Sequence, residues 1–62
     1  MGKKVIVQKN EENNYSVGIE SDGEVKWIEE NIKEEIHANA IAKIYWKEYK
    51  MEYKFSEQKE VE

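Results

Sequence analysis

Apolar and polar residues alternate along the first part of the chain, which is the pattern of half-buried β-strands. The segment KKVIVQK covers residues 3–9, a polar loop follows over residues 10–14, and the segment NYSVGIES covers residues 14–21. Each apolar segment predicts one strand. The residues that these two strands are expected to place on a common core face are Val5, Val7, Tyr15, Val17 and Ile19.

A tight hairpin turn is predicted at Asp22-Gly23. A two-residue type I′ turn needs a positive φ angle at both residues, and Asp-Gly is one of the pairs that adopt it most readily. The chain then returns as EVKWIE, residues 24–29, with a third alternating pattern. We expect Val25 and Trp27 to face the core from this third strand.

A helix is predicted after the third strand. Asn31 and Glu34 have the spacing of a capping box, so the helix is expected to begin at Ile32. It is expected to end near Trp46 or Lys47. At about 100° per residue, one apolar stripe would pack on the sheet, and the alanines within it would allow a close approach. This stripe consists of Ala38, Ile41, Ala42, Tyr45 and Tyr49.

Residues 49–55 are compatible with two structures, a fourth strand or a continuation of the helix. The helix would bring three like-charge pairs to i,i+4 spacing, each costing about 0.2–0.5 kcal/mol. It would also run about 36 Å, well beyond strands of about 23 Å. On the other side, no Gly, Pro or Asn between Ala40 and Phe55 marks the turn that a strand requires. We favour a strand from Tyr49 to Phe55, with a frayed tail over residues 56–62.

These elements predict one small α+β domain over residues 1–62, in the order β-β-β-α-β. Three antiparallel strands form a sheet packed by one helix, and the fourth, carboxy-terminal strand joins it. A chain of 62 residues buries only a small core. It has no cysteine for disulfides or a zinc site, so oligomerisation or a bound partner is the expected additional support.

The predicted helix carries a second apolar stripe. Ile36, Ala40 and Ile44 fall nearly opposite the stripe that is expected to cover the sheet. A monomer needs only one apolar helix face, so the second face predicts a contact surface. We expect a homodimer through this face, with Trp46 beside it as an interface anchor.

The charge balance indicates what kind of partner to expect. Fourteen acidic and ten basic residues give a formal net charge of −4, and every cation is a lysine. An acidic chain without arginine is a poor match for nucleic-acid phosphate and favours a protein with a basic surface. The carboxylates expected to bind such a partner are Glu29, Glu30, Glu34 and Glu35.

No catalytic, metal or cofactor site is predicted, and the chain is expected not to be an enzyme. His37 is the only histidine, and no serine or cysteine nucleophile lies near it in the sequence. A structural or solvent-exposed role is therefore expected for this histidine. The glutamate pairs lack the spaced oxygen ligands of a calcium loop.

The rival expectation is a small DNA- or RNA-binding regulator that uses the outer face of the sheet. That face is expected to be mildly basic, with no aromatic side chain for base stacking. Its nucleic-acid contacts would come from Lys4, Ser16 and Lys26, with Ile6, Gly18 and Ile28 beside them.

Residues 14–45, about half of the chain, resemble the AP2-like amino-terminal domains of phage and transposon integrases. This resemblance implies a three-stranded sheet followed by a helix, with DNA contacts from the exposed sheet face. The features that carry it are the Tyr15-x-Val17-x-Ile19 strand, the Asp22-Gly23 turn and the alanine-rich helix around Ala38 and Ala42.

In style, the chain also resembles small phage anti-defence proteins, including anti-CRISPRs. It is short, acidic and free of cysteine, and its residue usage is typical of AT-rich genomes. The resemblance implies a phage-encoded inhibitor that occupies a surface of a nucleic-acid-handling defence protein in the host cytoplasm. Residues 1–10 turn polar after three apolar residues, so neither a signal peptide nor a membrane span is expected.

Overall fold

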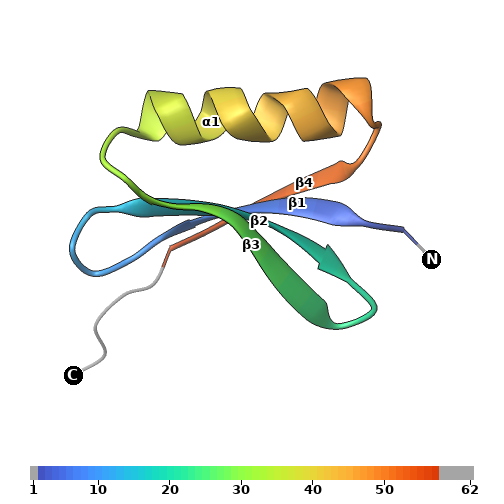
Figure 1. The fold of residues 1–62 in the computed structure, drawn as a ribbon, viewed down its shortest axis with the longest axis horizontal. Coiled ribbons are helices and arrows are strands. Elements are labelled where there is room, and N and C mark those ends of the chain that lie inside the picture. Colours follow the sequence, from blue (N-terminus) through green and yellow to red (C-terminus); the bar gives the residue numbers. More distant parts are fainter. Residues whose placement is uncertain (1, 58–62) are drawn as a thin grey trace.

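The computed structural model describes residues 2–57. These residues form a four-stranded sheet with one helix lying across a single face (Figure 1). The expected α+β architecture and the order β-β-β-α-β are confirmed. A turn of π-helix, η1, continues α1 without a break. The elements are β1 (Lys4–Lys9), β2 (Tyr15–Ser21), β3 (Glu24–Ile32), α1 (Glu35–Lys43), η1 (Ile44–Glu48) and β4 (Glu52–Glu57).

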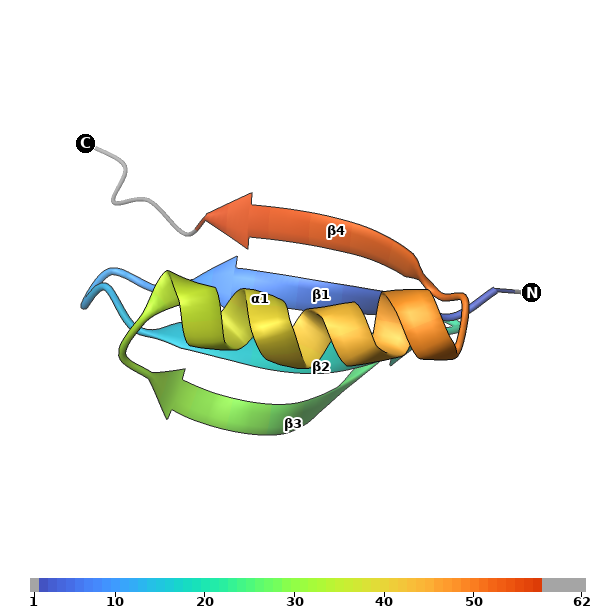
Figure 2. The ribbon, with the colours of Figure 1, turned by 90° about the horizontal axis from the view of Figure 1, so that it is seen from above.

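The strands lie in the order β3-β2-β1-β4, so β3 and β4 are the two edges. β2 is antiparallel to both of its neighbours, whereas β4 runs parallel to β1. A parallel pair needs a long crossover connection, and the helix supplies it between β3 and β4. Seen from above, the helix lies over the two central strands, with an edge strand on either side (Figure 2).

Both loops between the antiparallel strands follow the sequence expectation. Asp22 and Gly23 have φ angles of 55° and 84°, as a type I′ turn requires. In the polar loop before β2, the Oδ1 atom of Asn10 accepts hydrogen bonds from the backbone N–H groups of Glu12 and Asn14, at 2.9 and 3.0 Å. The side chain of Asn10 thus holds the loop closed.

The register of β2 and β3 corrects the expected faces of the third strand. Val25 lies opposite Glu20 and Trp27 lies opposite Gly18. Residues directly opposite each other in a sheet share a face, so Val25 and Trp27 lie on the face away from the helix. The expectation that they face the core is wrong. We call this uncovered side the open face of the sheet.

Two irregularities interrupt β3 beyond Trp27. Val17 pairs with Glu29 while Gly18 pairs with Trp27, so one step along β2 corresponds to two steps along β3. A second shift follows before Ile32 reaches its partner in β2, and Asn31 within it has a φ angle of 60°. Each extra residue changes which face the following side chains occupy. Glu29 and Ile32 therefore lie on the helix side of the sheet.

The hydrophobic core lies between the sheet and the helix. The expected apolar stripe of the helix is present at Ala38 and Ala42, which are fully buried, with Ile41 and Tyr45 packed against the core. Tyr49 is 64% exposed and was wrongly expected in this stripe. The buried residues of the core cluster are Val5, Val7, Tyr15, Val17, Ile32, Ala38 and Ala42.

The helix begins later than the capping-box pattern predicts. Ile32 is the last residue of β3, where it lies opposite Tyr15 in the core. Glu34 occupies the N-cap position, without a side-chain capping hydrogen bond, and the helix starts at Glu35. Burial of Ile32 against the sheet outweighs the local preference for a cap at Asn31, which is worth about 1 kcal/mol.

The helical segment ends at Glu48, within two residues of the expectation. The chain then turns at Lys50, whose φ angle is 58°. The N–H of Met51 donates back to the carbonyl oxygen of Tyr45, at 3.4 Å. Residues 52–57 form β4, so the helical alternative for residues 49–55 is wrong, and the expected strand starts three residues too early. Ser56 and Glu57 belong to β4 rather than to a tail, while residues 58–62 lie outside the described residues.

Candidate functional site

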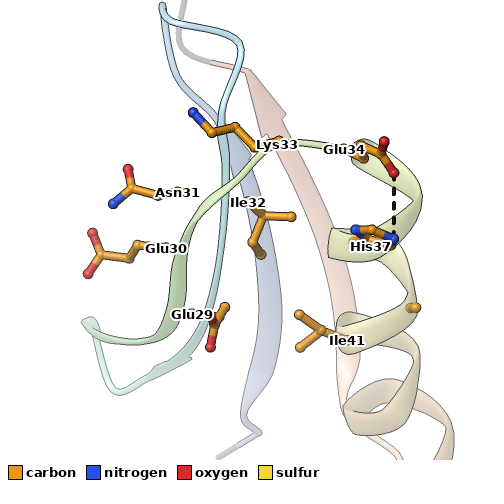
Figure 3. Close-up of a pocket in the computed structure, with 9 residues that line it drawn as sticks. Glu29, Glu30, Asn31, Ile32, Lys33, Glu34, His37 and Ile41 are labelled. Atoms are coloured by element: carbon orange, nitrogen blue, oxygen red, sulfur yellow. Dashed lines mark ion pairs between the residues drawn. The ribbon is translucent and has the colours of Figure 1, made fainter.

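A hollow of about 640 Å³ opens between the end of β3 and the flank of α1 that faces β3 (Figure 3). It forms because a helix about 10 Å wide cannot cover four strands spaced about 4.8 Å apart. We call it the β3–α1 hollow. Its lining residues are Glu29, Glu30, Asn31, Ile32, Lys33, Glu34, His37, Ala40 and Ile41.

The floor of the β3–α1 hollow is apolar. Ile32 extends from the strand and Ile41 extends from the helix, and both side chains point into the space between the two elements (Figure 3). Ile32 is buried and Ile41 is half-buried, so each offers only part of its surface to the hollow. Ala40, which is exposed, adds to this apolar surface from the side of the helix that faces away from the sheet.

Two carboxylates flank the apolar floor. Glu29 lies on the helix side of β3 because of the bulge that precedes it, and Glu34 lies at the start of the helix. Glu30 and Asn31 line the rim, and their side chains point away from the helix (Figure 3). A bound segment would therefore meet an acidic group at each end and hydrocarbon between them.

The electrostatic character of the hollow is acidic. Three glutamates line it, against Lys33 as the only lysine of the lining. The Nε2 atom of His37 lies 3.5 Å from the Oε1 atom of Glu34, which is an ion pair when the imidazole is protonated. Both side chains are more than half exposed, so this contact is accessible to a partner.

The four predicted acidic residues do not form one cluster. Glu29, Glu30 and Glu34 meet at the β3–α1 hollow, whereas Glu35 acts on the other flank of the helix, toward β4. Burial, and then the negative charge of Glu35, raise the pKa of Tyr53 above its ordinary value of 10.0. The hydroxyl of Tyr53 also donates a hydrogen bond to the Oδ1 atom of Asn39, at 3.2 Å.

The second apolar stripe of the helix faces away from the sheet, as the sequence predicts. Ile36 is 71% exposed, Ile44 is 52% exposed, and Ala40 between them is also exposed. Trp46 is separate from this stripe. It lines a smaller hollow of about 280 Å³ on the β4 side, together with Tyr53, Asn39 and Lys43.

The predicted nucleic-acid residues do not share a face. Lys4 lies opposite Glu20 and Ser16 lies opposite Gln8, which places both on the open face. Lys26 lies opposite Ile19 and therefore on the helix side of the sheet, so its expected position is wrong.

Trp27 is the aromatic residue of the open face that the alternation pattern wrongly assigns to the core. It is 39% exposed and contradicts the expectation that this face has no aromatic side chain. Its place could have been found from the Asp22-Gly23 turn, because a two-residue turn fixes Trp27 opposite Gly18.

Within residues 2–57, no group of three or more acidic or histidine side chains is placed to hold a metal ion. None of the helices in this described part is long and apolar enough to cross a membrane. No protein-family model, curated protein or solved structure matches the chain. Both family resemblances therefore stay predictions.

Proposed function

We propose that this chain is a non-enzymatic protein-interaction module whose β3–α1 hollow receives a basic segment of a partner protein. The observation that carries the proposal is the placement of Glu29 and Glu34 around an apolar floor of Ile32 and Ile41. A lysine or arginine side chain has an apolar stem and a charged head, which match the apolar floor and the carboxylates beside it. Its stem fits the floor while its head reaches a carboxylate.

Calorimetric titration with a peptide of alternating lysine and leucine tests this proposal. The double variant Glu29→Gln/Glu34→Gln is expected to bind at least about tenfold more weakly, since the loss of a single charge-assisted hydrogen bond, worth about 1.5–3 kcal/mol, already has that effect. Glu11→Gln/Glu12→Gln is the matched control, because both residues are exposed in the loop before β2 and the charge change is the same. Equal weakening in both variants, or no binding by the unmodified chain, contradicts the proposal.

In the wider proposal, the partner is a nucleic-acid-handling defence protein of a bacterial host, and the chain is a phage-encoded inhibitor acting in the host cytoplasm. The support is chemical: nucleic-acid-binding surfaces are basic, so an acidic module competes with phosphate for them. Expression in a bacterium with a nuclease-based defence should raise the plaque count of a restricted phage. The hollow variant Glu29→Gln/Glu34→Gln should lose this effect. A plaque count that the unmodified chain leaves unchanged contradicts the inhibitor role.

A second candidate function is supported by Trp27, which lies exposed on the open face, where Lys4 and Lys54 also lie. Exposed aromatic rings on an open sheet are platforms for single-stranded nucleic acid. Titration with oligo(dT) in a Trp46→Phe background, where Trp27 is the sole tryptophan, tests this function. Quenching that weakens with salt and with Lys4→Glu favours it, and unchanged fluorescence excludes it for this probe.

A further inference from the structure

The outer edge of β4 presents backbone groups that no other strand pairs with. β4 is one edge of the sheet, and within residues 2–57 no element lies against its outer side (Figure 2). The N–H of Glu52 donates to the carbonyl oxygen of Lys3, at 3.4 Å, so the backbone groups of Glu52 face β1. Because successive residues of a strand direct these groups to opposite sides, Tyr53 and Phe55 direct theirs to the free edge.

β4 is the more regular of the two sheet edges. Its pairing with β1 runs from Glu52 to Glu57 without a register shift, whereas the pairing of β3 is interrupted twice. Bulges and proline residues protect natural edges from pairing, and the chain has no proline. A backbone edge of this kind is complementary to another strand, so the geometry specifies a β-strand as the occupant.

Aromatic side chains lie beside this edge on the helix side of the sheet. Tyr53 and Phe55 lie opposite the core residues Val5 and Val7, so all four side chains share that face. The helix does not cover the two rings, which are 44% and 40% exposed, and Trp46 of the helical segment is 39% exposed. Trp46 and Tyr53 line the same hollow of about 280 Å³. We call Trp46, Tyr53 and Phe55 the β4 aromatic group.

We infer that a second copy of the chain pairs its own β4 with this edge, antiparallel and with the two-fold axis at Phe55. The two four-stranded sheets then form one continuous sheet, with both helices on the same face. Phe55 exchanges backbone hydrogen bonds with Phe55 of the second copy. Lys54 lies opposite Ser56 of the second copy. An axis at Lys54 would instead place two lysines directly opposite each other, which is unfavourable.

Charges on the flank of the helix that faces β4 select a second copy as the source of this strand. Glu35, at the start of α1, and Lys43, at its end, both lie on this flank. The two-fold axis makes the two helices antiparallel, so the end that carries Glu35 lies alongside the end of the other helix that carries Lys43. Opposite charges are thus brought together twice. A uniformly basic or acidic strand would match only one end of the flank.

The space between the two helices fits the aromatic groups. Each helix lies over the central strands, so the two helix axes are about four strand spacings, or 19 Å, apart. Helices about 10 Å wide leave a gap of about 9 Å above the paired β4 strands. The rings of both aromatic groups lie in this gap and together expose roughly 500 Å². With the strand edges, the contact falls in the class below about 1,200 Å², so the dimer is weak and concentration-dependent.

This dimer leaves the β3–α1 hollow open. The hollow lies on the β3 side of the helix, and β3 becomes the outer edge of each half of the continuous sheet. The inference therefore does not depend on the proposed function of the hollow, and the two are tested by different variants.

Solution mass over a dilution series tests the dimer. The mass should rise from one chain toward two between about 10 µM and 1 mM, the range of weak interfaces. Phe55→Lys should hold it at one chain, because two lysines would meet at the axis. Ile44→Glu is the matched control, since Ile44 is 52% exposed on the side of the helix away from the sheet, and it should dimerise normally. A constant mass of the unmodified chain, a dimer that persists in Phe55→Lys, or its loss in Ile44→Glu overturns the inference.

Cysteine cross-linking tests the register without removing an aromatic ring, and the chain has no cysteine of its own. A mixture of Lys54→Cys and Ser56→Cys should form disulfides under mild oxidation. These two positions lie directly opposite each other between hydrogen-bonded pairs, with Cα atoms about 4.5 Å apart, which a disulfide can span. Lys54→Cys alone should not cross-link, because its two copies would lie about 8 Å apart. Efficient cross-linking of Lys54→Cys to itself, or none in the mixture, overturns the inference.

Discussion

The indole ring of Trp27 lies directly over Gly18 on the open face of the sheet. A β-carbon on residue 18 would lie 2.6 Å from Cε3 of Trp27 and 2.9 Å from the backbone oxygen of Lys26. Real β-carbons do not approach other atoms this closely. Glycine is therefore required for the cross-strand pair to close, and the tryptophan covers the surface that the missing side chain leaves bare.

Gly18→Ala should destabilise the fold by about 1–3 kcal/mol, as expected for overpacking at a site where backbone blocks relief. Gly2→Ala is the matched control and should be nearly neutral, because a β-carbon there meets no atom within 4 Å. Urea unfolding measures both. Equal stability of the two variants would show that Trp27 and β3 move aside freely.

Ala42→Leu tests the close approach of the helix to the sheet. Ala42 is fully buried, so the larger side chain should cost about 1–3 kcal/mol of unfolding free energy. Ala40→Leu on the exposed side of the same helix should change it by about 0.5 kcal/mol or less. Thermal unfolding at low protein concentration compares the two. A similar loss in both would mean that the helix does not pack on its alanines.

Lys50→Gly should stabilise the protein by about 0.5–1 kcal/mol, because glycine adopts a positive φ without the steric cost that a side chain incurs. Lys50 has a φ angle of 58° in the turn that leads to β4. Lys47→Gly is the opposite control. Lys47 lies within the helical segment, so this variant should lose about 1 kcal/mol of unfolding free energy. A loss of stability in Lys50→Gly would contradict the described turn.

Tyr53 should ionise at a higher pH in the folded protein than in the unfolded chain. Burial and the charge of Glu35 raise its pKa above 10.0, so the folded state holds the phenol proton more tightly than the unfolded state does. The resulting stability is present below pH 10 and is lost as pH rises through the folded pKa. Absorbance titration of tyrosinate should lose one step above pH 10 in Tyr53→Phe. An unchanged titration above pH 10 would contradict this environment.

The hydrogen bond from Tyr53 to Asn39 also joins β4 to the helix. Because it is exposed, its loss in Tyr53→Phe should cost only about 0.5 kcal/mol at neutral pH, the low end for such bonds. Urea unfolding at pH 7 measures this cost separately from the alkaline titration. A loss well above this value would mean that Tyr53 contributes more than the one bond.

The hairpin shows how far the sequence determines the fold. Asp22-Gly23 predicts the turn correctly, and a two-residue turn also fixes the pairing of Gly18 with Trp27. The turn therefore predicts the correct face for Trp27, whereas alternation within the third strand, taken without the turn, predicts the core face. The bulges beyond Trp27 have no comparable signal, and they bring Glu29 to the hollow.

The remaining errors, at the two ends of the helix, have different causes. The Asn31–Glu34 spacing is a valid local signal, but Ile32 gains more by packing in the core as a strand residue. At the other end, Lys50 turns the chain without Gly, Pro or Asn, so no local signal marks the turn. The exposed stripe at Ile36 and Ile44 was predicted correctly, because a 3.6-residue period is enough to find it.

Mapping a bound lysine- and leucine-rich peptide by amide chemical shifts tests most directly whether a basic segment binds in the β3–α1 hollow. The shifted amides should cluster along this hollow, from Glu29 to Glu34 and on to His37 and Ile41. The cluster should disappear in Glu29→Gln/Glu34→Gln and persist in Glu11→Gln/Glu12→Gln. Shifts centred on the open face around Trp27, or a spectrum that the peptide leaves unchanged, would contradict it.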